Sequence, residues 1–404
     1  SDVYKRQVLH DTDWGRLFHA YGVADDTPGH LRNLASPQVA ERQAALTHLH
    51  SAILHQGTIY SATPAAVGVI TTLLRDATAR AALDADTMAA LVAFLGQVAN
   101  SLNEIEPPQA DPYPCDAELD TLILHLRDDE DGEDEEGWGS PLISTLMCHA
   151  FLALRAMTGD VLEALAPYLS DDDNETRREA VNAAAQWGVM APDSAAAHAV
   201  AARLQARLDD GAARDARDDR AGLVLALGQL GHDVSRWLDD ADDAIRACAA
   251  LFVPDARATA ILVTALTRPE EVDAWFTQRP PYFPMHTRLT LLGALIERQV
   301  PLVQLLPAAL ALIARTQGGL LANGEWGRIL TLAFPDQAAA FRPGQRPPLP
   351  AQLSPAQHAV LLALHANPDL WNPRDGNAGL ARMTVGLPDT RDALAAYLAA
   401  TPVR

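Results

Sequence analysis

Residues 170–180 read SDDDNETRREA, an acidic turn followed by an arginine, an alanine three residues later and an apolar helical pattern. The same order returns in DDAIRACA at residues 242–249 and, more weakly, in SPQVAERQAAL at residues 36–46. A helix pair that cannot bury its apolar face alone must stack on copies of itself, so recurrence of one such unit is typical of solenoids. The recurring Arg-x-x-Ala phrase therefore predicts an all-α superhelix of stacked antiparallel helix pairs.

The bulk composition agrees with this prediction. A chain of 404 residues is too long for one compact core, but a solenoid avoids that limit because each repeat contacts only its neighbours. Hydrophobic residues make up 49% of the chain, aromatic residues only 5%, and the mean hydropathy is −0.03. These values favour one elongated domain whose helices pack through small side chains.

The charge excludes two classes of partner. Acidic residues number 52 and basic residues 31, which gives a formal net charge of −21. This field repels phosphate backbones and anionic lipid headgroups. No apolar run reaches the roughly 18 residues that a membrane-spanning helix needs. We therefore expect neither a nucleic acid nor a membrane as partner.

The three cysteines indicate the redox state of the compartment, and residues 1–7 differ in composition from the rest of the chain. Cys115, Cys148 and Cys248 are odd in number and form no CxxC pair, so the sequence implies neither a disulfide framework nor a zinc knuckle. A reducing cytoplasm is the compartment we expect, and a monomer the oligomeric state. Residues 1–7 lack an initiator methionine and hold the only lysine, so we interpret them as a non-native or disordered leader.

Helix-start signals divide the rest of the chain. Ser or Thr followed by Pro occurs at residues 36, 63, 140 and 354, where a hydroxyl can cap a helix that proline begins. Residues 17–34 are expected to form a capping helix and a loop. The predicted segments are a capping helix with the first helix pairs (8–126), an acidic mobile loop (127–139), repeats (140–268) and a helical part that continues the superhelix (269–404). Among the helices expected are 84–102, 117–126, 141–157, 174–187, 242–252, 302–315, 355–366 and 389–400.

The chain resembles bacterial HEAT-repeat proteins, in particular the short HEAT-like repeats of phycobilin lyases. The resemblance is specific over about residues 140–267 and weaker over 34–75. It implies that the turn acid and the first-helix arginine of each repeat form a ladder between repeats. The matching pairs here are Asp173 with Arg177 and Asp242 with Arg246.

Motifs that would specify chemistry are missing from the sequence. It contains no HExxH, GxSxG, GxGxxG or GxxxxGK[ST] pattern. One class of HEAT-repeat enzymes binds iron through His-Glu dipeptides, and none occurs here. The thirteen histidines include His48 and His50, which would point in different directions on a helix. We therefore predict no catalytic residue, metal or cofactor.

Two loops are candidates for binding a partner. The first is the carboxylate run 128–136 with Trp138 after it, where a solvated loop could attract a basic protein. Its alternatives are a merely solubilising insertion and a tryptophan that packs on the next helix. The second is the loop 55–61, whose alternative is an inter-helix turn with Gly57 in a left-handed conformation. The candidate residues are Gln56, Tyr60, Asp131, Glu133, Asp134, Glu135, Glu136 and Trp138.

These observations predict a non-catalytic scaffold that binds another protein, with a basic partner as the specific hypothesis. A lyase-like enzyme or accessory acting on a tetrapyrrole or a protein-bound cofactor is the alternative that the resemblance leaves open, and it requires a deep apolar groove. DNA binding would require a continuous positive stripe. The arginines between residues 203 and 220 are interleaved with aspartates, which favours a solvated face with local ion pairs.

Overall fold

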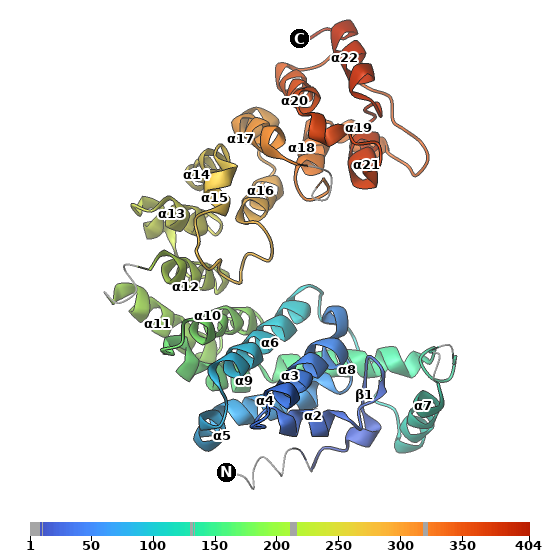
Figure 1. Cartoon of the computed structure of the whole chain (residues 1–404), viewed down its shortest axis with the longest axis vertical. Helices are drawn as coiled ribbons and strands as arrows, with labels where there is room; N and C mark the ends of the chain where they lie inside the picture. The colour runs from blue at the N-terminus through green and yellow to red at the C-terminus, as the bar shows by residue number, and fades with distance from the viewer. Residues whose placement is uncertain (1–8, 10, 130–131, 133, 211–215, 318–321) are drawn as a thin grey trace. The chain divides into compact units, whose positions relative to one another are not determined.

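The computed structural model describes residues 9, 11–129, 132, 134–210, 216–317 and 322–404 (Figure 1). Within these residues the chain is helical apart from a two-stranded hairpin and isolated bridges, so the predicted all-α class is confirmed. The chain divides into an N-terminal unit, residues 1–215 with 229–232, and a C-terminal unit, residues 216–228 with 233–404.

The N-terminal unit holds the hairpin and the first helices. Its elements are β1 (Phe18–His19), β2 (Gly22–Val23), α2 (Thr27–Asn33), α3 (Val39–His48), α4 (Thr63–Arg75), α5 (Ala77–Ala81), α6 (Ala85–Asn103), α7 (Asp116–Asp128), α8 (Pro141–Ala156), α9 (Thr158–Leu165), α10 (Asn174–Gly188) and α11 (Ala195–Asp209). Its longest helix, α6, packs along α10. A Cβ atom added to Gly96 of α6 would lie 3.4 Å from the Cα of Ala183 in α10, so small residues let the two backbones approach closely.

The C-terminal unit continues with shorter helices. They are α12 (Arg217–Gln229), α13 (Asp243–Ala250), α14 (Ala256–Leu266), α15 (Pro269–Asp273), α16 (Thr287–Glu297), α17 (Leu302–Arg315), α18 (Trp326–Ala333), α19 (Pro335–Ala340), α20 (Pro355–Ala366), α21 (Gly376–Thr384) and α22 (Arg391–Ala400). Its core is apolar, but Arg288 is also buried there, where its guanidinium bonds both Asp273 and Glu325. One buried cation thus pairs with two carboxylates, and Arg315, 3.5 Å from Asp273, adds a second positive charge.

Several helix starts follow the serine and proline signals. Ser140 caps α8 by accepting from the Leu142 N–H, and Ser354 caps α20 through a capping box with Gln357. The bounds of α17 and α20 coincide with the predicted 302–315 and 355–366. At the first signal, by contrast, α3 begins at Val39 rather than beside Pro37.

The expected capping helix within residues 17–34 is wrong in its position. Residues 18–23 form the β1–β2 hairpin, in which His19 pairs with Gly22 and Gly22 has a φ of 121°. A helix follows only at Thr27, because Pro28 in the first turn begins a helix rather than ending one. This order places His19 of the hairpin against Asp26, directly before α2, and His48 of α3.

The membrane prediction can be compared with the helices themselves. Among the described residues no single helix is long and apolar enough to cross a membrane. One bent pair, Pro141–Ala156 and Thr158–Ser170 at 49°, reaches the required length and composition only when its two parts are taken together.

Candidate functional site

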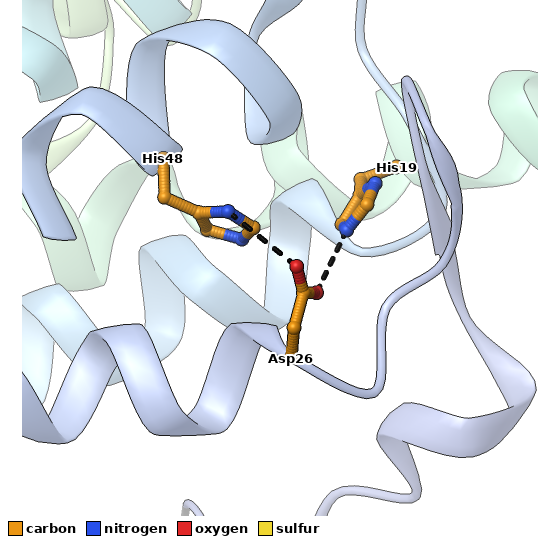
Figure 2. Close-up of side chains that lie close together, drawn as sticks. All are labelled: His19, Asp26 and His48. Atoms are coloured by element: carbon orange, nitrogen blue, oxygen red, sulfur yellow. Dashed lines mark hydrogen bonds and ion pairs between the residues drawn. The ribbon is translucent and has the colours of Figure 1, made fainter. Parts of the chain in front are cut away.

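Three side chains from separate elements meet in the N-terminal unit (Figure 2). His19 lies at the end of β1, Asp26 directly before α2, and His48 at the end of α3. The Nε2 atom of His19 is 2.9 Å from Oδ1 of Asp26, and Nδ1 of His48 is 3.9 Å from Oδ2 of the same carboxylate. Both imidazoles are buried, with exposed fractions of 3% and 7%, whereas the aspartate side chain is 55% exposed.

Local hydrogen bonds fix the proton on one of the two rings. The backbone N–H of Tyr21 donates to Nδ1 of His19 at 3.1 Å. A neutral His19 must therefore carry its proton on Nε2, from which it donates to Asp26. On the other ring, Nε2 of His48 lies 2.9 Å from the hydroxyl of Thr27, which can donate or accept. His19 is thus a hydrogen-bond donor to the carboxylate in its neutral state.

The surroundings of the cluster also shift the pKa values of His48 and Asp26. Burial lowers the pKa of His48 to about 4, although the Asp26 carboxylate opposes the shift, and His30 stacks on His48 with ring centroids 4.1 Å apart. Burial works to raise the pKa of Asp26, but the hydrogen bond from His19 and the nearby rings outweigh it and lower the pKa below its ordinary value. At neutral pH the cluster therefore holds a carboxylate between two imidazoles, of which His48 is uncharged.

The cluster has the residue types of a metal site but not its hydrogen-bond pattern. The three ligand atoms lie within 4.8 Å of one another, the one such group found among the described residues. A metal-bound histidine normally donates from its second ring nitrogen. Here that nitrogen of His19 accepts from Tyr21, so a metal on Nε2 would break this bond. The geometry therefore favours a hydrogen-bonded network that ties the hairpin to α2 and α3.

Catalysis of the hydrolase type also lacks the necessary access. The hydroxyl of Thr27 contacts His48, and His48 lies near Asp26. In space the three side chains are thus arranged like the nucleophile, base and carboxylate of a hydrolase. Thr27 is 0% exposed, however, so no substrate can reach its hydroxyl. The 3.9 Å separation of His48 from Asp26 also exceeds hydrogen-bond distance. Sequence reasoning missed the cluster because its members lie on three elements and share no helical spacing.

The described part of the acidic loop is an ordered turn. Both ring nitrogens of His125 in α7 lie 3.0 Å from carboxylates, Nδ1 from Asp134 and Nε2 from Glu136. Asp134 also accepts from the backbone N–H of Glu136 at 2.9 Å, and hydrogen bonds lower its pKa, chiefly that from Glu136 and then that from His125. Residues 134–139 thus form a hydrogen-bonded turn, and the mobility expected of the loop stays a prediction. Asp131 and Glu133 lie outside the described residues.

Trp138 anchors this turn instead of standing free in solvent. Its ring packs edge-on against Phe18 of β1 with centroids 5.7 Å apart, at the margin of a core formed largely by α7 and α8. Glu135, three residues earlier, stays exposed. The tryptophan therefore holds the turn against the hairpin while the carboxylates face outward.

The second candidate loop separates into a buried and an exposed residue. Tyr60 is 8% exposed and belongs to the same core as Phe18, with the two rings 6.5 Å apart. Gln56 is exposed and has a φ of 51°, next to Gly57 with a φ of 78°. The left-handed Gly57 of the alternative interpretation is present. Of this pair only Gln56 is available to a partner.

The recurring phrase forms the same structure three times. Nη1 of Arg42, Arg177 and Arg246 donates in each case to the carbonyl oxygen six residues earlier: Ser36 at 2.8 Å, Asp171 at 2.6 Å and Asp240 at 2.6 Å. Arg177 also donates to the side chain of Asn174, and Arg246 pairs with Asp243, in each case within the same turn. We call this contact the arginine turn lock.

The two aspartates of the phrase begin their helices. Asp173 accepts from the backbone N–H of Thr176 at 2.8 Å, which lowers the pKa of its carboxyl, and Asp242 accepts from Ala244 at 2.9 Å. Asp242 also receives Nε of Arg217 at 2.6 Å, from the preceding helix α12. Asp242 thus pairs with an arginine of the preceding helix, and the ladder between repeats that the resemblance implies stays a prediction.

Comparison with protein-family models, with curated proteins and with solved structures finds no match to this chain. What it does is therefore inferred from its own residues.

Proposed function

We propose that this chain is a non-catalytic helical-repeat protein of the cytoplasm that binds a basic surface of another protein. The binding surface, which we call the acidic lobe, comprises α7 and the turn after it. Its exposed carboxylates are Asp116, Glu118, Asp120, Asp128, Glu135 and Glu136. The three cysteines are unpaired, which supports a reducing compartment.

The observation that carries the proposal is the fixed acidic turn. Trp138 is packed on Phe18 and His125 contacts Asp134 and Glu136, so these carboxylates are held in place rather than dispersed on a solvated tail. Fixed charges lose less conformational entropy when a partner binds. A solubilising insertion would need no such anchoring.

The charges of the acidic lobe are only partly neutralised within the chain. Arg16 lies 3.0 Å from both Asp116 and Asp120 and can offset only one of them. Asp128 stands in the last turn of α7, where the helix dipole disfavours a negative charge. Leu124, 60% exposed, provides an apolar contact among the acids. Such a mixture suits a basic partner with some apolar surface.

Binding of a labelled arginine-rich peptide, followed by fluorescence anisotropy at low and high salt, tests the proposal. The double variant Asp128→Asn with Glu135→Gln should weaken binding several-fold at low salt, and the difference should shrink as salt screens the charges. The matched control removes the exposed carboxylates Asp336 and Asp392 of the C-terminal unit. Equal loss in the control, or no binding at low salt, would overturn the proposal.

The tetrapyrrole alternative rests on the resemblance over residues 140–267. A cavity of about 280 Å³ lies between α13, α14 and α15, and most of its lining residues fall within that range. Its charged lining residues are Arg246, Arg257, Arg268, Asp243 and Glu271. It lies below the volumes typical of ligand pockets, and its charged wall does not suit an apolar ring system. A change in the absorbance spectrum on titration with a bilin would favour this alternative over protein binding.

A further inference from the structure

A larger cavity lies in the C-terminal unit, between α16, α17, α18 and α21. Its volume is about 680 Å³, within the range of small-molecule sites. The wall is largely aliphatic, and one of its side chains, Leu380, is 42% exposed. The aliphatic lining residues are Ile296, Val300, Leu302, Leu332, Leu380 and Ala381.

Arg328 of α18 is the one charged residue among those that line this cavity. Its half-buried guanidinium has no hydrogen-bond or ion-pair partner among the described residues. Other arginines of the same unit have described partners: Arg315 bonds to Glu270 at 2.9 Å, and Arg391 to the carbonyl oxygen of His365 at 2.6 Å. The guanidinium of Arg328 can therefore donate to a ligand in the apolar cavity.

The backbone makes room for this guanidinium. A Cβ atom at Gly293 of α16 would stand 3.3 Å from Nη1 of Arg328, closer than most such contacts. The amide side chains of Gln299 and Asn323 also line the cavity and can donate hydrogen bonds. Glycine at 293 therefore lets the cation lie against α16, at the edge of the aliphatic wall.

We propose that this cavity binds a small carboxylic acid with an apolar body, such as a medium-chain fatty acid. Arg328 holds the carboxylate in a two-pronged contact, which the planar guanidinium favours, and the aliphatic wall covers the hydrocarbon part. A single cation matches one negative charge better than the nearly double charge of a phosphate. The inference is independent of the acidic lobe, which lies in the other unit.

Calorimetric titration of the full chain with decanoate tests the proposal, with decanol as the uncharged ligand of the same chain length. We expect decanoate to bind at least about tenfold more tightly than decanol, since only the carboxylate forms a charge-assisted hydrogen bond with Arg328. Arg328→Gln should abolish that preference, Arg328→Lys should retain part of it, and Gly293→Ala should reduce decanoate binding. The control Arg374→Gln removes an exposed arginine and should change nothing.

Three results would overturn the proposal. Equal affinities for decanoate and decanol on the wild-type chain would do so without any variant, even if Arg328→Gln failed to fold. Undiminished decanoate binding by a folded Arg328→Gln would exclude the arginine. Binding of an apolar peptide through its free C-terminus, with no binding of decanoate, would assign the cavity to another class of ligand.

Discussion

The indole N–H of Trp187 in α10 donates a hydrogen bond of 2.8 Å to the carbonyl oxygen of Leu95 in α6. The tryptophan is fully buried, and the close approach is allowed by Gly96, next to Leu95, and by Ala183, one turn before Trp187. This bond therefore joins two residues that lie 92 positions apart in sequence.

Replacing Trp187 by Phe should lower the free energy of unfolding of the N-terminal unit by about 1 to 2 kcal/mol, because the hydrogen bond is lost and a small cavity remains. Urea unfolding followed by circular dichroism measures the change. Trp275→Phe, at a half-buried tryptophan whose indole N–H has no described acceptor, is the control and should cost clearly less. Similar losses in both variants would show that the bond to Leu95 contributes nothing specific.

Replacing Arg177 by Ala should destabilise the start of α10 by about 1 kcal/mol, because the turn lock to the Asp171 carbonyl is removed. The adjacent Arg178→Ala is a matched control, since no bond from Arg178 to the turn is described. Hydrogen exchange of amides in residues 174–180 should increase in the first variant only. Unchanged exchange there would mean that the lock does not hold the turn.

The buried imidazole of His48 should make stability depend on pH. Its pKa is lowered from 6.5 to about 4, so between these values the unfolded chain binds a proton that the folded chain does not. Stability should therefore fall as pH decreases from 6.5 to 4, by on the order of 2 kcal/mol from this residue. Asp26, His19 and His30 face the ring, and of these only Asp26 favours the charged form.

His48→Gln keeps a possible hydrogen bond to Thr27 and removes the titration. Its unfolding free energy should change less between pH 6.5 and 4 than that of the wild type, as measured by urea unfolding at several pH values. Parallel pH profiles of the two proteins would refute the assignment.

Replacing Gln56 by Gly should raise stability by about 0.5 to 1 kcal/mol, because a side chain with a φ of 51° is strained and glycine is not. Gln56→Ala, which keeps the strain, should have little effect and serves as the control. Differential scanning calorimetry would show a higher Tm for the glycine variant alone. A lower Tm would indicate that the glutamine side chain itself stabilises the loop.

The sequence predicts most helices well because their signals are local. Ser354 and Pro355 specify the start of α20 through one cap and one fixed dihedral angle, and the apolar spacing carries the helix to Ala366. Gly376 and Gly379 weaken the local preference for a helix in residues 376–384, yet α21 forms there. Packing against α18 outweighs that preference.

The site depends on contacts that local patterns do not contain. His19 meets Asp26 and His48 only because the hairpin turns at Gly22, and a two-residue strand gives almost no periodic signal. Trp138 could be predicted as an anchor or as an exposed side chain, and only the position of Phe18 decides between them. The acids of the loop were evident from composition, but their attachment to His125 was not.

The arginine turn lock spans seven residues, so in each of its three copies the donor and the acceptor lie within one turn. A change in the length of the chain outside those seven residues leaves both partners of the bond in place. The start of each of these helices thus carries a closing contact of its own.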